Sequence, residues 1–182
     1  MTTLTGHLLV AGPRLVDPNF ARTVVLVAAH DDDGAIGVIL NRPTEIDVSD
    51  HVPGWDSILV DPQVVFIGGP VQPEVAVALA GSSAPPEEGW RPISPHLGLF
   101  DLGVPPASII DSIDRVRVFS GYSGWAPGQL EQEVAGNDWL IVPPGSDEPF
   151  SADPGEMWAD VLRSQGPPIS MYASYPPDLR LN

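Results

Sequence analysis

The 182-residue chain contains no cysteine and no lysine. Without cysteine it can form no disulfide, no thiolate nucleophile and no Cys-ligated zinc site, and this composition is compatible with a reducing compartment. Without lysine it cannot form a phosphate-binding loop of the P-loop type, and it has no amine for kinase-type or Schiff-base chemistry. These two absences exclude several large classes of enzyme.

Positive charge of any kind is scarce in this chain. The 8 basic residues, all arginine, stand against 24 acidic residues, which gives a formal net charge of −16. A surface with this excess of negative charge repels the phosphate backbone that supplies most non-specific nucleic-acid affinity. The composition therefore disfavours nucleic acid as a partner.

Long apolar runs are also missing. The longest, residues 24–29, is far shorter than the ~20 residues that span a bilayer. The first ten residues lack a basic region and a long apolar core, so they do not resemble a signal peptide. We therefore expect a cytoplasmic protein that does not associate with membranes.

The chain does have enough apolar residues for a core and many turn-forming residues. Hydrophobic residues make up 43% of the sequence, and the length fits one domain over residues 1–182. The 18 glycines and 22 prolines lie between the apolar runs and are not pooled in one linker. Residues 80–95 are predicted to form a long surface loop, and residues 167–182 a tail.

Strands and helices are predicted to interleave along the chain. The Asp-Asp-Asp-Gly stretch at 31–34 lies between two β-branched apolar runs and predicts a hairpin. Further strands are expected at 7–11, 64–70, 73–80, 97–103, 115–121 and 138–143. Helices are expected at 17–22, 105–113, 127–135 and 153–166, the last with Asp153 as its N-cap. The absence of a regular β-α-β period predicts an α+β domain with a mixed sheet.

The order and spacing of several stretches resemble the YqgE/AlgH family of bacterial proteins. These stretches are DPNFARTVV (17–25), HDDDGAIGVILNRP (30–43), GGP (68–70) and GYSGWAPGQLEQEV (121–134), the last followed by Trp139 and Leu140. The resemblance covers nearly the whole chain. It implies an α+β fold with a branched β-sheet that includes a small barrel and is surrounded by helices. One branch of the family carries the label of transcriptional regulator, but the resemblance implies no established activity.

Two enzymatic alternatives are open. Ser123 lies in Gly-Tyr-Ser-Gly-Trp, where Trp125 replaces the second glycine of a nucleophile elbow, and family members usually carry a small residue such as Ala at the position of Ser123. The other alternative is a weak metal site using His30 and Asp33, although the acidic stretch lacks the spacing of a calcium loop and is typical of a solvated hairpin turn. The sequence therefore favours a non-catalytic protein without a cofactor.

Polar, aromatic and glycine residues gather at the predicted strand ends. Arg42 places a cation after a strand, and the amides of Gly68 and Gly69 could bind an oxyanion. Gly121 and Gly124 are predicted to let the chain reverse its direction. The large side chains of Tyr122 and Trp125 either pack against this reversal and hold it in place or face a ligand. We predict a binding or regulatory module for a small ligand or a protein partner. Its candidate ligand-binding residues are Arg22, Asn41, Arg42, Gly68, Gly69, Tyr122, Trp125 and Gln129.

Overall fold

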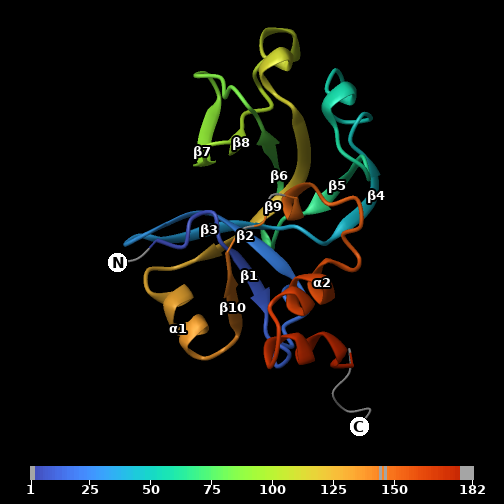
Figure 1. Cartoon of the computed structure of the whole chain (residues 1–182). Coiled ribbons are helices and arrows are strands. Elements are labelled where there is room, and N and C mark those ends of the chain that lie inside the picture. Colours follow the sequence, from blue (N-terminus) through green and yellow to red (C-terminus); the bar gives the residue numbers. More distant parts are fainter. Residues whose placement is uncertain (1–2, 144, 146, 177–182) are drawn as a thin grey trace.

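A computed structural model describes residues 3–143, 145 and 147–176 of the chain. Most of the regular structure in this part is β-strand (Figure 1). The strands are β1 (Leu8–Ala11), β2 (Val24–Asp31), β3 (Gly34–Ile39), β4 (Pro43–Asp47), β5 (Val64–Ile67), β6 (Val71–Gly81), β7 (Trp90–Ser94), β8 (Leu97–Phe100), β9 (Arg115–Trp125) and β10 (Trp139–Val142). The α-helices are α1 (Gln129–Ala135) and α2 (Met157–Ser164), and the 3-10 helices are η1 (Asp56–Ile58), η2 (Pro106–Ser108), η3 (Ile110–Ser112), η4 (Glu148–Phe150) and η5 (Ile169–Ser174).

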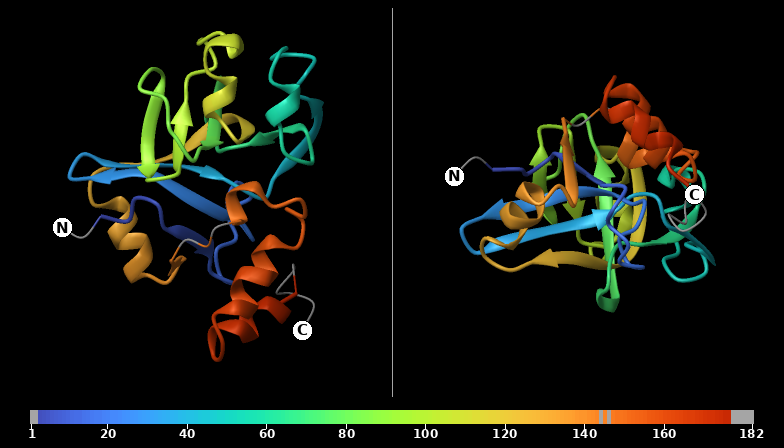
Figure 2. Two further views of the ribbon diagram at one scale, coloured as in Figure 1. Left: turned by 45° about the horizontal axis from the view of Figure 1, so that its top comes forward. Right: turned by 90° about the horizontal axis from the view of Figure 1, so that it is seen from below.

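The strands form one branched, mixed sheet. Its main path runs β10-β1-β2-β3-β9-β6-β8-β7, while β5 branches from β9 and carries β4. Strands β5 and β9 pair in parallel through Phe66 and Phe119, and the other named pairs are antiparallel. The sheet curls as a half-barrel, and its pairing does not close into a ring within the described residues (Figure 2).

The expectation that helices surround the sheet is wrong. The short helix α1 lies beside β10, and α2 with η5 lies at the end of the molecule that carries the C-terminus (Figure 1). The upper half of the sheet, from β4 to β9, has only single 3-10 turns beside it. The reason is that few segments carry a 3.6-residue apolar period, whereas most apolar residues alternate or run continuously as in strands.

Strand β9 continues through the segment that was predicted to reverse the chain. Its first part pairs with β6, and from Ser123 to Trp125 it pairs with β3. The change of neighbour occurs beside Gly121, which has a φ of +68°, a conformation that glycine adopts without strain. A Cβ atom at Gly121 would lie 2.7 Å from the carbonyl oxygen of Gly69, so the close approach of the two strands also requires glycine. The chain therefore kinks at Gly121 within a strand that pairs with both β6 and β3, and it does not turn back there.

The apolar residues form a larger and a smaller cluster. The larger one lies between β1, β2, β3, β10 and the two α-helices and includes Leu26, Trp139 and Trp158. The smaller one fills the upper half of the sheet around Trp55 and Phe100, whose ring centroids are 5.6 Å apart. The apolar stripe of α2 is buried as predicted, and it is fixed by a 2.9 Å hydrogen bond from the Trp158 indole to the Ala11 carbonyl.

Several predicted boundaries differ from the structure. The predicted 80–95 loop is interrupted by β7, whose Pro92 is tolerated because this strand lies at the edge of the sheet. Residues 105–113 form two 3-10 turns instead of one helix.

The C-terminal third departs from its predicted form in two places. Helix α2 begins after Glu156 and not after Asp153. Of the predicted tail, η5 packs against the larger cluster through Ile169, Tyr172 and Ala173, and residues 177–182 lie outside the described residues. Within residues 3–143, 145 and 147–176, no helix has the length and apolar character needed to cross a membrane.

Candidate functional site

Three of the predicted residues, Arg22, Asn41 and Arg42, lie at the 17–22 turn, which forms as expected. The amide of Ala21 donates to the Asp17 carbonyl at 2.7 Å, and the Asp17 side chain accepts from the Asn19 amide at 2.8 Å. The side chain of Asp17 thus caps a single helical turn. The turn ends at Arg22, which has a φ of +58°.

Asn41 and Arg42 bind the backbone of this turn. The Arg42 guanidinium donates to the carbonyls of Pro18 at 2.9 Å and Ala21 at 3.2 Å. The Asn41 side chain accepts from the Val24 amide and donates to the Arg22 carbonyl, both at 2.9 Å. These polar groups therefore fix the position of the turn against the end of β3.

Arg22 connects the same turn to the C-terminal segment. Its guanidinium carbon lies 4.1 Å from the ring centroid of Trp158, which is a cation–π contact. One of its nitrogens donates to the Tyr175 carbonyl at 2.9 Å. The backbone at Tyr175 is therefore fixed by a residue that precedes it by 153 positions.

Gly68 and Gly69 lie against β9. The Gly68 amide donates to Ser120 at 2.9 Å, and its carbonyl accepts from the Ile39 amide at 2.9 Å. A Cβ atom added at Gly68 would lie 2.3 Å from the carbonyl oxygen of Gly121. A Cβ atom added at Gly69 would lie 2.2 Å from backbone atoms of Tyr122. The glycines are thus required by the close approach of two strands, and the Gly68 amide is already bonded within the sheet.

Two of the remaining candidates, Trp125 and Gln129, meet at Glu133, which the sequence analysis did not single out. Glu133 Oε2 accepts the indole N–H of Trp125 at 2.8 Å, and Oε1 accepts from the Gln129 side chain at 2.8 Å. Tyr122 is half-buried and packs against the larger apolar cluster. The signal that could have identified Glu133 is its i, i+4 spacing from Gln129, on a helix beside two tryptophans whose indole nitrogens need an acceptor.

Phe20 joins these two groups of residues. Its ring centroid is 6.3 Å from that of Trp125 and 5.6 Å from that of Trp139. The structure therefore joins Arg22, Asn41 and Arg42 to Trp125 and Gln129 in a junction around the 17–22 turn, whereas Gly68 and Gly69 lie against β9. In the described part of the chain, the side-chain hydrogen bonds of these residues go to other groups of the same chain.

The residues of the two enzymatic alternatives are held in the same way. Ser123 is fully buried, and its hydroxyl donates to the Gly68 carbonyl at 3.1 Å. His30 Nδ1 accepts from the Leu4 amide at 3.1 Å, so Nε2 carries the proton and donates to Glu131 at 3.0 Å. Asp33 lies in the exposed hairpin turn, and the described residues contain no group of three metal-ligating side chains placed to hold an ion.

A cavity of about 350 Å³ lies beside this junction. Three segments form its walls: the turn after β1, the turn between α1 and β10, and η5 with the residue that follows it. Its volume is within the range of small-molecule sites. The lining residues are Pro13, Arg14, Gly136, Asn137, Asp138, Leu140, Tyr172 and Tyr175.

The cavity wall combines a cation with aromatic rings. The rings of Tyr172 and Tyr175 pack edge to face with centroids 5.7 Å apart. Arg14 is exposed, and in the described part of the chain its guanidinium has no hydrogen-bond or ion-pair partner. The Asp138 carbonyl accepts from the Gly12 amide at 2.7 Å, which holds two walls together. This wall can bind an anionic group and a flat ring at the same time.

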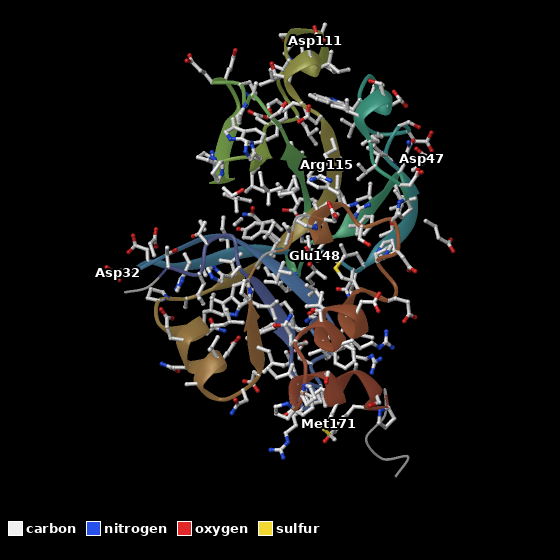
Figure 3. All side chains as sticks on the ribbon, viewed as in Figure 1. Asp32, Asp47, Asp111, Arg115, Glu148 and Met171 are labelled. Carbon is white, nitrogen blue, oxygen red and sulfur yellow. The ribbon has the colours of Figure 1, made fainter. Side chains whose placement is uncertain are left out.

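A larger cleft of about 500 Å³ separates η4 from α2, but its lining carries four carboxylates against one arginine. Arg115 there stacks on Phe150 with its guanidinium carbon 4.4 Å from the ring centroid, and Figure 3 shows it near Glu148. The neighbouring Arg117 is buried, and desolvation lowers its pKa to about 10. Arg117 donates to the Asp61 carbonyl at 2.7 Å, and its guanidinium stacks on the Phe66 ring. It therefore packs in the protein interior and does not line the cleft.

Comparison with known sequences gives matches over nearly the whole chain. A family model described as AlgH-like matches residues 8–170. A UPF0301 protein of Streptomyces avermitilis is 44% identical over 187 residues, covering 100% of this chain and 97% of the relative. A UPF0301 protein of Streptomyces coelicolor is 43% identical, with the same shares covered.

Two solved structures are similar to this fold. The crystal structure of protein DIP2367 from Corynebacterium diphtheriae has a TM-score of 0.86 at 29% identity, covering 93% of this chain and 91% of that one. The solution structure of the AlgH protein from Pseudomonas aeruginosa has a TM-score of 0.72 at 26% identity, covering 95% and 94%. The range matched by the family model includes the cavity walls up to Leu140 but ends before Tyr172 and Tyr175.

Proposed function

The chain belongs to the AlgH-like family, and we propose that it is a non-catalytic binding module that holds a small aromatic anion in the cavity beside Arg14. One observation supports this proposal above the others. Arg14 is an arginine without a partner in the described residues, and it lies at a cavity with two tyrosine rings. An arginine pairs favourably with carboxylate or phosphate, and aromatic walls favour flat ligands.

In this proposal the predicted strand-end residues do not contact the ligand but fix the positions of the residues that line the cavity. Arg22 fixes the backbone at Tyr175, and Glu133 fixes Trp139, which follows the α1–β10 turn. Asn41 and Arg42 hold the 17–22 turn from which Arg22 extends. Cavity-lining residues that are already held in place by such contacts lose little conformational entropy when a ligand binds.

Thermal shift measurements test this function. The probes are aromatic carboxylates, phenyl phosphate and nucleoside monophosphates, each titrated against the full chain. A ligand that binds only the folded protein raises Tm in proportion to the logarithm of its concentration. We expect such a shift for at least one class, and a loss of about tenfold or more in affinity in Arg14→Gln.

The matched control is Arg91→Gln, because Arg91 is an exposed arginine on β7 outside the cavity. This variant should bind the probes like the unaltered chain. Stabilisation that survives Arg14→Gln together with Tyr172→Ala would contradict the proposed site, and so would the failure of all three probe classes.

We also propose a cytoplasmic location, which is compatible with the cysteine-free composition. Transcriptional regulation through direct DNA contact is the weaker candidate, because the net charge is −16 and two of the described arginines donate to carbonyls of their own chain near the 17–22 turn. A DNA-binding titration at several salt concentrations separates the two candidates. Affinity that falls steeply with salt would show phosphate contacts and favour the regulator.

A further inference from the structure

A groove of about 250 Å³ lies on the face of the sheet formed by β4, β5, β6 and β9. Its lining is mainly apolar and includes Ile46, Val52, Val65, Pro73, Val75 and Ala76. Ile46 is 49% exposed and Val75 is 40% exposed. Ile67, which is 45% exposed, lies on the same face of β5 as Val65 because alternate residues of a strand share a face. These side chains form one uncovered apolar surface, here called the β4–β6 groove.

Two strands beside the β4–β6 groove have a free edge. Within the described residues, strand β4 pairs only with β5. Strand β6 pairs with β8 only from Ala78 onward, so Ala76 and Val77 have β9 as their one strand neighbour among the described residues. The register between β6 and β9 also shifts between Val71 and Ala76, which leaves the stretch between them without ladder partners. An edge of this kind offers backbone groups to an added strand.

Acidic residues lie in and around the β4–β6 groove: Glu74 is one of its lining residues, and the others are on β4 and in the turn that follows it. Glu45, Asp47, Asp50 and Glu74 are exposed, and within the described part of the chain none forms an ion pair. The side-chain and backbone hydrogen bonds from Ser49 lower the pKa of Asp47, and Figure 3 shows Asp47 at the outer side of β4. Residues 43–118 hold eleven carboxylates and three arginines, one of which is the buried Arg117. The groove therefore presents apolar contact area within a negative field.

We propose that the β4–β6 groove binds an extended, basic segment of a partner protein. Apolar side chains of this segment contact Ile46 and Val75, while a Lys or Arg residue pairs with Glu74, which lines the groove. The exposed carboxylates of Glu45 and Asp47 on β4 add to the negative field that attracts the segment. The free edge of β4 or β6 supplies backbone hydrogen bonds, as in other cases of strand addition. Electrostatic complementarity selects a cationic segment and raises its association rate.

The charge also argues against a second copy of this chain as the occupant. Each copy carries a net charge of −16 and no lysine, and none of the arginines that the structure describes lines the groove. Two such faces would bring unpaired carboxylates together, which is costly in a desolvated interface.

A random peptide library displayed on phage, selected against the immobilised full chain, tests the proposal. We expect the enriched sequences to have a net positive charge and apolar residues at alternate positions. A synthetic peptide of the consensus sequence should bind with an affinity that falls as the salt concentration rises. The double variant Ile46→Lys/Val75→Lys should bind it roughly tenfold more weakly or worse.

The matched control is Val16→Lys/Ile141→Lys, since these positions are exposed apolar residues outside the groove. This control should bind the peptide like the unaltered chain. The proposal is overturned if no sequence is enriched, if the enriched sequences are neutral or acidic, or if both double variants bind equally well.

Sedimentation velocity provides a further test: self-association that Ile46→Lys/Val75→Lys abolishes would identify a second copy as the occupant. Arg14→Gln should leave peptide binding unchanged, so the two proposals can fail separately.

Discussion

Trp125 and Trp139 donate their indole N–H groups to the same atom, Oε2 of Glu133, each at 2.8 Å. The two rings meet edge to face with centroids 6.1 Å apart. One carboxylate thereby ties the end of β9 and the start of β10 to helix α1. Hydrogen bonds to a charged acceptor are stronger than neutral ones, so this carboxylate is a stabilising element of the lower half of the sheet.

We predict that Glu133→Gln destabilises the protein by about 1–3 kcal/mol, because a neutral amide that also presents N–H groups cannot replace all three accepted bonds. Urea unfolding followed by circular dichroism measures the loss, and tryptophan fluorescence should change in the folded state. Glu88→Gln is the control, since Glu88 is exposed and should shift stability by no more than about 0.5 kcal/mol. Equal stability of the two variants would refute the role of Glu133.

A second prediction concerns the kink in β9. Gly121→Ala forces a side chain into a left-handed conformation, at about 1–2 kcal/mol, and also brings Cβ to 2.7 Å and 2.8 Å from the carbonyl oxygens of Gly69 and Val71. Gly128→Ala is the matched control, because its φ is +74° and no atom lies within 4 Å of the added Cβ. We expect the loss of unfolding free energy to be clearly larger at Gly121. A similar loss at both glycines would mean that the strand contact with Gly69 is not tight.

The third prediction separates structure from catalysis at Ser123. Ser123→Ala removes one hydrogen bond to the Gly68 carbonyl and should cost about 0.5–1.5 kcal/mol of stability. The Ser123→Ala variant and the unaltered chain should hydrolyse p-nitrophenyl esters at the same rate. Turnover by the unaltered chain that disappears in a folded Ser123→Ala protein would instead support the hydrolase.

The fourth prediction is a titration of Asp47. Its side-chain hydrogen bond with Ser49, followed by the bond from the Ser49 amide, holds the pKa of Asp47 below its usual value. Because the folded-state pKa is lowered, this stabilisation is present above the unfolded-state pKa and is lost as the pH falls through the folded-state value. Carboxyl-carbon NMR should show that Ser49→Ala raises the pKa of Asp47, whereas Ser57→Ala should leave it unchanged. No rise in Ser49→Ala would show that the hydroxyl does not hold the carboxylate.

Local sequence signals were enough to predict part of this fold. The Asp-Asp-Asp-Gly hairpin and the buried stripe of α2 are set by turn chemistry and by side-chain period, which operate over a few residues. Strand β9 could not be predicted in full, because its second half contains two glycines that locally favour a turn. Its strand conformation depends on pairing with β3, which is about 85 residues earlier in the chain.

The candidate site shows the same limit. Arg22, Asn41 and Arg42 were selected from the sequence as candidate ligand-binding residues at strand ends, but the backbone carbonyls to which they donate become apparent only in the folded chain. Arg14 and Tyr175 were not selected, because 161 positions separate them and the second lies in a segment predicted to be a tail. A pair of tyrosines at i and i+3 in that segment was the available signal.

The position of β1 between β2 and β10 has a consequence for synthesis of the protein. Strand β2 pairs with β1 soon after it leaves the ribosome, but Leu8 meets its second neighbour, Val142, only when the 111 residues that follow the end of β2 have been made. At translation rates of about 5–20 residues per second, one edge of β1 stays open for on the order of ten seconds. During that interval the nascent chain exposes an apolar strand to other nascent chains, so early chaperone contact should favour its recovery over aggregation.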